Sequence, residues 1–162
     1  MGTRGRIGIV GDDGKVTSIY SHWDNYPKWT GAMLLNHYTD RAKVESLISL
    51  GAISSLHENV EPDPKGGTKT VWKGLKRVEK PAKGKHTFDE PQNGVVVAYH
   101  RDRGEDWESC KPRVDKDART FAKGDVEEWG YLFRDGKWFV VDGHRDSRRL
   151  MPLTEKYIAA KH

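Results

Sequence analysis

The chain has 162 residues and a formal net charge of +4, with 32% charged and 35% hydrophobic residues. This length and balance predict one α+β domain over residues 1–162, with a modest core under a heavily charged surface. A lone cysteine, Cys110, excludes an internal disulfide, and the apolar runs are too short to predict a membrane span or a secretory signal, so we expect a cytosolic protein.

Residues 5–22 are predicted to form a β-hairpin, because a short apolar run precedes the turn 11–14 and an alternating segment follows it. A short helix is expected over 30–38. Thr39 is then predicted as the N-cap of a second helix, and Gly51 is placed to end it. The apolar residues that recur there at helical spacing are Val44, Leu47 and Ile48.

The segment 61–94 contains four prolines and five glycines and is predicted to be a long basic loop or flap, with room for a short strand at 70–72. Between Lys65 and His86 it has eight basic residues and one acid, a net +7, which leaves −3 for the rest of the chain. Such a segment suits a phosphate backbone bound without sequence readout, and a solvated loop is the alternative. The candidate nucleic-acid contacts are Lys69, Lys73, Lys76, Arg77 and Lys80.

The second half of the chain is predicted to supply the remaining elements. Residues 94–99 have the pattern of a buried strand, residues 118–123 that of a weak helix, and residues 131–141 that of a second hairpin around 134–136. A closing helix is expected over 153–161, with Pro152 near its start. Together the elements predict an antiparallel sheet of about five strands with helices packed on one face.

Three His-x-Asp triplets each follow a predicted strand. Because residues i and i+2 point the same way on extended backbone, each histidine and its aspartate could face one site at the end of the sheet. Such a set suits a divalent metal, acid–base catalysis or an anionic ligand, and the alternative is that these are ordinary strand-end residues. The sequence has no nucleotide-loop or zinc-helix signature, so no cofactor and no metal is assigned. The candidate catalytic residues are His22, Asp24, His100, Asp102, His144 and Asp146.

Arginines and aromatic residues lie close to these triplets in the sequence. Guanidinium groups bind phosphate and carboxylate groups, and aromatic rings stack on bases, so the two together predict a pocket for a nucleotide-like anion. The alternative is that the aromatic residues belong to the core and the arginines pair with neighbouring acids. The candidate ligand-binding residues are Arg4, Trp23, Tyr26, Arg101, Arg103, Arg145 and Arg148.

Three stretches carry a resemblance to a known family: Met1-Gly2-Thr3-Arg4, Tyr20-Ser21-His22-Trp23-Asp24-Asn25-Tyr26-Pro27 and Ala98-Tyr99-His100-Arg101-Asp102-Arg103-Gly104-Glu105. The chain resembles a family of small proteins encoded by bacteriophages and prophages, to which no activity is assigned. The resemblance implies a phage origin and action in the cytoplasm of the bacterial host. It implies no catalytic role for any residue.

These features lead us to expect a non-enzymatic accessory protein that counters host defence by binding. Its partner would be a phosphate-bearing ligand, either a nucleotide signal or a nucleic acid, or it would be a host bacterial protein. No membrane partner is expected. The alternative is a small hydrolase or nuclease that uses the histidines and aspartates above, with or without a metal ion.

Overall fold

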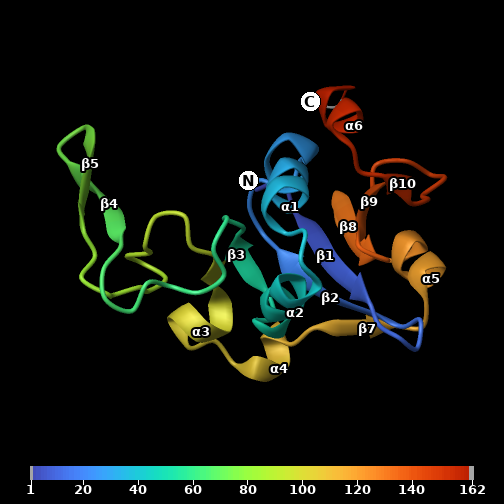
Figure 1. Cartoon of the computed structure of the whole chain (residues 1–162), viewed down its shortest axis with the longest axis horizontal. Helices are drawn as coiled ribbons and strands as arrows, with labels where there is room; N and C mark the ends of the chain where they lie inside the picture. Colours follow the sequence, from blue (N-terminus) through green and yellow to red (C-terminus); the bar gives the residue numbers. More distant parts are fainter. Residues whose placement is uncertain (1, 161–162) are drawn as a thin grey trace.

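A mixed sheet of eight strands forms the centre of the molecule, which this computed structural model describes over residues 2–160 (Figure 1). The strands of this sheet are β1 (Gly5–Val10), β2 (Val16–Ser21), β3 (Ile53–Ser55), β6 (Val97–Ala98), β7 (Arg113–Asp115), β8 (Trp129–Arg134), β9 (Lys137–Asp142) and β10 (Met151–Pro152). They run in the order β10-β9-β8-β1-β2-β3-β6, and β7 pairs with β2 beside that path.

The predicted α+β class is confirmed, but the predicted antiparallel sheet of about five strands is wrong in strand number and in direction. β1 pairs with β8, and β2 with β3, in parallel. A turn fixes the pairing direction only of the two strands that it joins. β1 and β8 are far apart in the sequence, so no local turn signal could indicate how they pair.

Both predicted hairpins of the main sheet are confirmed. β1 pairs antiparallel with β2 around the turn 11–14, and β8 pairs antiparallel with β9. Asp135 and Gly136 connect β8 to β9 with φ values of 52° and 75°. This left-handed backbone at both central residues is what a two-residue type I′ turn requires.

One face of the sheet is covered by the π-helical turn η1 (Pro27–Gly31) and by helices α1 (Ala32–His37), α2 (Arg41–Ser49) and α6 (Glu155–Ala160). The apolar residues predicted for the second helix are buried in this core: Val44, Leu47 and Ile48. The N-cap residue is Asp40 rather than Thr39, because Asp40 is the last residue with extended backbone. Gly51 follows the helix with a φ of 74°, the left-handed conformation expected after a helix end.

The opposite face of the sheet is covered by α5 (Ala118–Lys123), which has the bounds predicted for the weak helix. Phe121 of α5 packs there with Leu132 and Val141. Leu132 stands between Tyr131 and Phe133, which belong to the core on the first face. The expectation of helices on one face is therefore wrong, because the unbroken apolar run of β8 is typical of a strand buried on both faces.

The chain between residue 94 and α5 departs from the predicted elements. The predicted strand 94–99 is reduced to β6, because helix α3 (Tyr99–Arg103) begins directly after it. Helix α4 (Trp107–Cys110) and strand β7 lie in a polar stretch for which neither was predicted.

The C-terminal part starts its helix later than expected. Pro152 belongs to β10, and α6 begins at Glu155. Lys161, the last residue of the predicted helix, lies outside the described residues. Among the residues that the structure describes, no helix has the length and apolar character that crossing a membrane requires.

A separate two-stranded sheet lies within the segment predicted as a loop. β4 (Thr68–Lys73) and β5 (Lys76–Pro81) form an antiparallel hairpin, and Figure 1 shows it extending away from the main sheet. Gly74 in its two-residue turn has a φ of 67°, as the first position of a type II′ turn requires. The short strand allowed at 70–72 lies within β4, but over the rest of 68–81 the prediction of a loop is wrong, because most prolines and glycines of the segment lie in its flanks and this turn.

Replacing Phe121 by alanine tests the helix on the second face. The ring is fully buried, so its loss leaves a cavity and should lower the free energy of unfolding by about 3–5 kcal/mol. Urea unfolding followed by circular dichroism measures the change. Lys123→Ala on the same helix is the exposed control, with an expected change below about 0.5 kcal/mol. A Phe121→Ala protein as stable as the wild type would contradict the packing of α5.

Candidate functional site

The hairpin β4–β5 carries four lysines on one of its two faces. The register places Lys69 opposite Lys80 and Lys73 opposite Lys76. Because side chains alternate along a strand, these four residues share a face, with one valine pair between them. We call Lys69, Lys73, Lys76 and Lys80 the lysine face. Three of the four are exposed, and Lys69 is half-buried.

The other face of the hairpin carries Trp72 and Arg77, which are opposite each other. The Arg77 guanidinium lies 5.2 Å from the centroid of the Trp72 ring, a cation–π contact. Trp72 is 66% exposed, and Leu75 in the turn is 97% exposed. Large apolar side chains at this degree of exposure gain little from folding.

The lysine face is electrostatically strained in the isolated protein, because like charges directly opposite each other destabilise a strand pair. Lys69 is compensated by Glu90, 2.6 Å away, and the hydrogen bond and charge of Lys69 lower the pKa of this exposed carboxyl. Within the described chain, no carboxylate lies within 4 Å of the ammonium groups of Lys73, Lys76 and Lys80. A polyanion laid along the lysine face would supply the missing negative charge.

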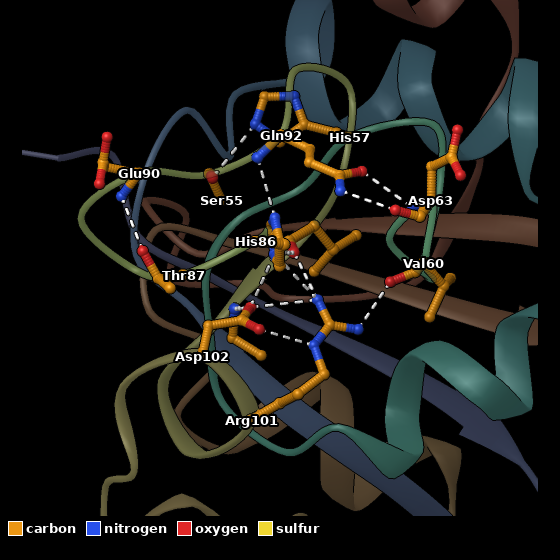
Figure 2. A network of polar contacts seen from close by, with 12 residues as sticks. Ser55, His57, Val60, Asp63, His86, Thr87, Glu90, Gln92, Arg101 and Asp102 are labelled. Atoms are coloured by element: carbon orange, nitrogen blue, oxygen red, sulfur yellow. Dashed lines mark hydrogen bonds and ion pairs between the residues drawn. The ribbon is translucent and has the colours of Figure 1, made fainter. Parts of the chain in front are cut away.

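The base of the hairpin is fixed by the buried carboxylate of Asp102, shown in Figure 2. This side chain is only 2% exposed. It accepts hydrogen bonds from the backbone N–H of Ala98 at 2.7 Å, from the His86 ring at 3.1 Å and from Nε of Arg101 at 2.8 Å. Each donor compensates part of the cost of burying the charge.

Arg101 extends the contact to both ends of the segment 61–94. Its guanidinium donates to the carbonyl oxygens of Val60 and Val96, each at 2.7 Å. Val60 precedes the segment and Val96 follows it, so one side chain on α3 holds the two ends together (Figure 2). The predicted ligand residue Arg101 thus has a structural role.

His86 and Gln92 continue the network into the segment. The Gln92 backbone N–H donates to Nδ1 of His86 at 2.9 Å, so the proton of the neutral ring is on Nε2 and faces Asp102. The buried Gln92 side chain accepts from the Asp63 N–H at 2.8 Å and donates to the Asp63 carbonyl at 2.9 Å. A Cβ at Gly67 would lie 2.7 Å from the Gln92 amide oxygen, so this position requires glycine.

We call Asp102, Arg101, His86 and Gln92 the clamp. Beyond it, Asn93 joins the hairpin directly, because its backbone N–H donates to the Thr68 carbonyl at 2.7 Å. The hairpin is therefore an arm on a fixed base, although two isolated strands are only marginally stable.

The three His-x-Asp triplets lie along one edge of the main sheet. A continuous row of paired residues marks this edge: Ala98, Ile53, Ser21, Gly5, Trp129 and Asp142. The triplets follow Ser21, Ala98 and Asp142 in the chain. Neighbouring strands are about 4.8 Å apart, so the outer two of these six strands are roughly 24 Å apart. The triplets share an edge, but they are too far apart to form one small site.

Each histidine of the triplets has a partner other than its own aspartate. These partners are the Tyr20 hydroxyl for His22 (2.7 Å), the Glu105 carbonyl oxygen for His100 (2.7 Å), and Asp142 (2.8 Å) and Glu128 (3.5 Å) for His144. Although burial raises the pKa of Asp142, hydrogen bonds from the backbone and ring of His144 produce a net lowering. The histidines are therefore held by local contacts.

His100 and Asp102 do not face one site, because they lie on helix α3, where residues i and i+2 point in different directions. The expectation of extended backbone is wrong for this triplet. Asp24 is exposed in a loop with a φ of 59°, and Asp146 is exposed after β9. In the described part of the chain, no three residues among His, Cys, Asp and Glu are grouped so that they could hold a metal ion.

The other predicted ligand residues are largely occupied by contacts within the protein. Arg103 lies over the Phe88 ring at 4.2 Å and pairs with Glu105 at 2.7 Å. Arg145 lies 3.4 Å from Asp142. The Arg148 guanidinium donates to the Gly124 carbonyl at 2.8 Å.

Arg4, Trp23 and Tyr26 lie near the middle of the triplet edge. The backbone N–H of Arg4 donates to the Glu128 carboxylate at 2.9 Å, and its side chain is exposed. The Trp23 ring is 42% exposed and packs edge-on against His22 at 4.8 Å. Tyr26 is half-buried as the N-cap of η1. The predicted stacking pocket is therefore not assembled from these residues and the arginines above.

Sequence analysis did not select a serine–histidine pair that lies at the end of β3. Ser55 Oγ is 3.2 Å from Nε2 of His57 (Figure 2). Burial lowers the pKa of His57, so the ring is neutral and able to accept a proton. The Ser-x-His spacing on extended backbone was the available signal. A catalytic pair also needs a group that orients the histidine through a hydrogen bond. The His57 ring packs against the edge of Trp29 at 5.9 Å, a contact that does not fix the position of its proton.

Comparison with known proteins shows no match to a protein-family model, to a curated protein or to a solved structure.

Asp102→Ala tests the clamp. Removing the carboxylate leaves Arg101 without its ion pair in a largely buried position, which should lower the free energy of unfolding by about 3–5 kcal/mol. Limited trypsin digestion should then cut between Lys65 and Lys85 markedly faster than in the wild type, because the base of the arm opens. Glu105→Ala is the matched control, since it removes the exposed partner of Arg103 and should cost less than about 1 kcal/mol. Unchanged cleavage in Asp102→Ala would contradict the clamp.

Proposed function

We propose that the chain is a non-enzymatic binding protein whose β4–β5 hairpin contacts the phosphate backbone of a nucleic-acid duplex. The observation that carries the proposal is the lysine face: four lysines on one side of a projecting two-stranded ribbon, three of them without an acidic partner among the described residues. Lysine is a mobile point charge, which suits contact with a backbone more than recognition of one fixed group.

The shape of the hairpin supports a duplex as the partner. A two-stranded ribbon is narrow enough to enter the major groove, with its side chains directed toward the phosphates. Lys69 and Lys73 are four residues apart on extended backbone, roughly 13 Å, and each is opposite a lysine on β5. This spacing offers two cationic pairs along the ribbon axis. The valines between them offer no base-specific hydrogen bond, so binding should be independent of sequence.

The resemblance to phage and prophage proteins supplies the proposed setting, which is the cytoplasm of a bacterial host. There, a protein that covers nucleic acid would counter defence by hiding the substrate of a host enzyme. A host protein as partner is the competing form of this proposal, supported by the exposed Trp72 and Leu75 at the end of the arm. The enzymatic alternative has less support, because the triplet histidines are spread along the sheet edge and held by local contacts.

Neutralising the lysine face tests the proposal. For the wild type, the log–log dependence of duplex affinity on salt should have a slope of about −0.9 per phosphate contacted, or near −3.6 for four. Replacing Lys69, Lys73, Lys76 and Lys80 by glutamine should abolish most of this slope and leave the thermal unfolding of the domain close to that of the wild type. Fluorescence anisotropy with a labelled 20-base-pair DNA at several salt concentrations measures it.

The matched control neutralises four exposed lysines elsewhere: Lys15, Lys28, Lys137 and Lys156. It changes the net charge equally but should retain most of the slope, because it leaves the lysine face intact. If both quadruple variants lost the same part of the salt dependence, the binding would depend on the net charge of the protein and not on the lysine face. The absence of duplex binding by the wild type at low salt would refute the proposal.

Trp72→Ala separates duplex from single-stranded binding. The ring lies on the face opposite the lysines, so duplex affinity should change by less than about twofold. A single strand stacked on the ring would lose about 1–3 kcal/mol of binding free energy in the same variant. Anisotropy with duplex and single-stranded DNA of one sequence distinguishes the two, and a large loss with the duplex would contradict the assigned face.

A further inference from the structure

A cavity of about 340 Å³ lies beside α5, on the second face of the sheet. Its walls come from three separate parts of the chain: α5, the end of β8, and the segment before β10. Five of its lining residues are basic, and none is acidic: Arg119, Lys123, Arg134, Arg148 and Arg149. Arg148 is the candidate ligand-binding residue in this set, and Arg149 is next to it in the chain, whereas Arg119, Lys123 and Arg134 are brought to them by the fold.

Within the part of the chain that the structure describes, the basic side chains of this cavity form no close ion pair, although hydrogen bonding to Thr120 and, at longer range, the charge of Arg119 lower the pKa of the Asp117 carboxylate. Among the described residues, no carboxylate lies within 4 Å of a charged nitrogen of any of the five. The acids on the neighbouring segments have other contacts. Asp117 caps α5 by accepting from the Thr120 N–H at 2.8 Å, Asp125 accepts from the Glu127 N–H at 3.0 Å, and Asp142 contacts His144 and Arg145.

Two of the five basic side chains are held in place by the protein. Arg134 lies over the Phe139 ring at 4.4 Å, and Arg148 donates to the Gly124 carbonyl oxygen at 2.8 Å. The other three are exposed at the rim and remain able to turn toward a ligand. A site with fixed and mobile cations can orient an anion and then close around it.

The floor of the cavity is apolar and belongs to the second core. Ala122 is buried in that core, and Ala118 and Leu150 pack against it. Aliphatic side chains offer no hydrogen-bond donors or acceptors, so they can pack against the face of an aromatic ring. They cannot distinguish one base from another by the polar groups on its edge.

We propose that this cavity binds a free nucleoside triphosphate, with the phosphates among the arginines and the base against Ala118, Ala122 and Leu150. The volume lies within the range of small-molecule sites. Several guanidinium forks fit a polyphosphate, which presents many oxygen acceptors within a short length. The inference is independent of the duplex proposal, because Figure 1 shows α5 and the β4–β5 hairpin at opposite ends of the molecule.

Isothermal titration calorimetry with three probes tests the site: ATP, inorganic tripolyphosphate and adenosine. ATP should bind more tightly than either of the others, because it alone engages both the arginines and the floor. Replacing Arg119 and Arg149 by glutamine should weaken ATP binding at least about tenfold, since each removes a charge-assisted contact. Both side chains are exposed, so the fold should be unaffected, and thermal unfolding verifies this.

Two controls separate this site from the arm. The variant with four glutamines on the lysine face should bind ATP as the wild type does, and Lys15→Gln with Lys28→Gln should do so as well. Unchanged ATP affinity after substitution of Arg119 and Arg149, or no ATP binding by the wild type, would overturn the proposal. Tripolyphosphate binding as tightly as ATP would overturn the role of the floor. A single-stranded oligonucleotide that competes more strongly than ATP would assign the cavity to a nucleic-acid strand and overturn the free nucleotide.

Discussion

The position of the β4–β5 arm depends on the hydrogen bonds and the ion pair of one buried carboxylate, that of Asp102. A charge at 2% exposure is stable only when donors surround it, and those donors come from the backbone of Ala98 and from the side chains of His86 and Arg101. Arg101 then reaches the carbonyl groups at both ends of the segment 61–94. The ion pair between Arg101 and Asp102 therefore holds together the two ends of this long segment. The contacts of this pair offset the conformational entropy that the chain loses when the ends are brought together.

This arrangement explains how a strand pair with a repulsive face can persist. The hairpin β4–β5 has no sheet behind it, and opposed lysines weaken it further. Its stability has to come from its ends, where Gln92 and Asn93 bond to backbone groups of the segment.

Local features of the fold were predictable from the sequence, and long-range features were not. The type I′ turn at Asp135 and Gly136 and the spacing of Val44, Leu47 and Ile48 are short-range signals, and the structure has both elements. The parallel pairing of β1 with β8 has no local signal. Asp102 illustrates the difference within one residue: its His-x-Asp context predicted a strand-end site, whereas its burial depends on His86 and on the start of α3 directly after β6.

The chemistry of the two basic regions differs in a way that the net charge of +4 conceals. The arm carries lysines on extended backbone, and three of the four ammonium groups have no acidic partner among the described residues. The α5 cavity carries four arginines and one lysine over an aliphatic floor, and two of the arginines are held in place by contacts within the protein. The lysines lie close together in the sequence and were selected there as nucleic-acid contacts, whereas Arg148 was selected for a different pocket, beside the triplets. The remaining arginines of the cavity lie on three segments, which come together because β8 is packed on both faces. The proposed nucleotide site therefore depends on the same packing that contradicted the prediction of helices on one face only.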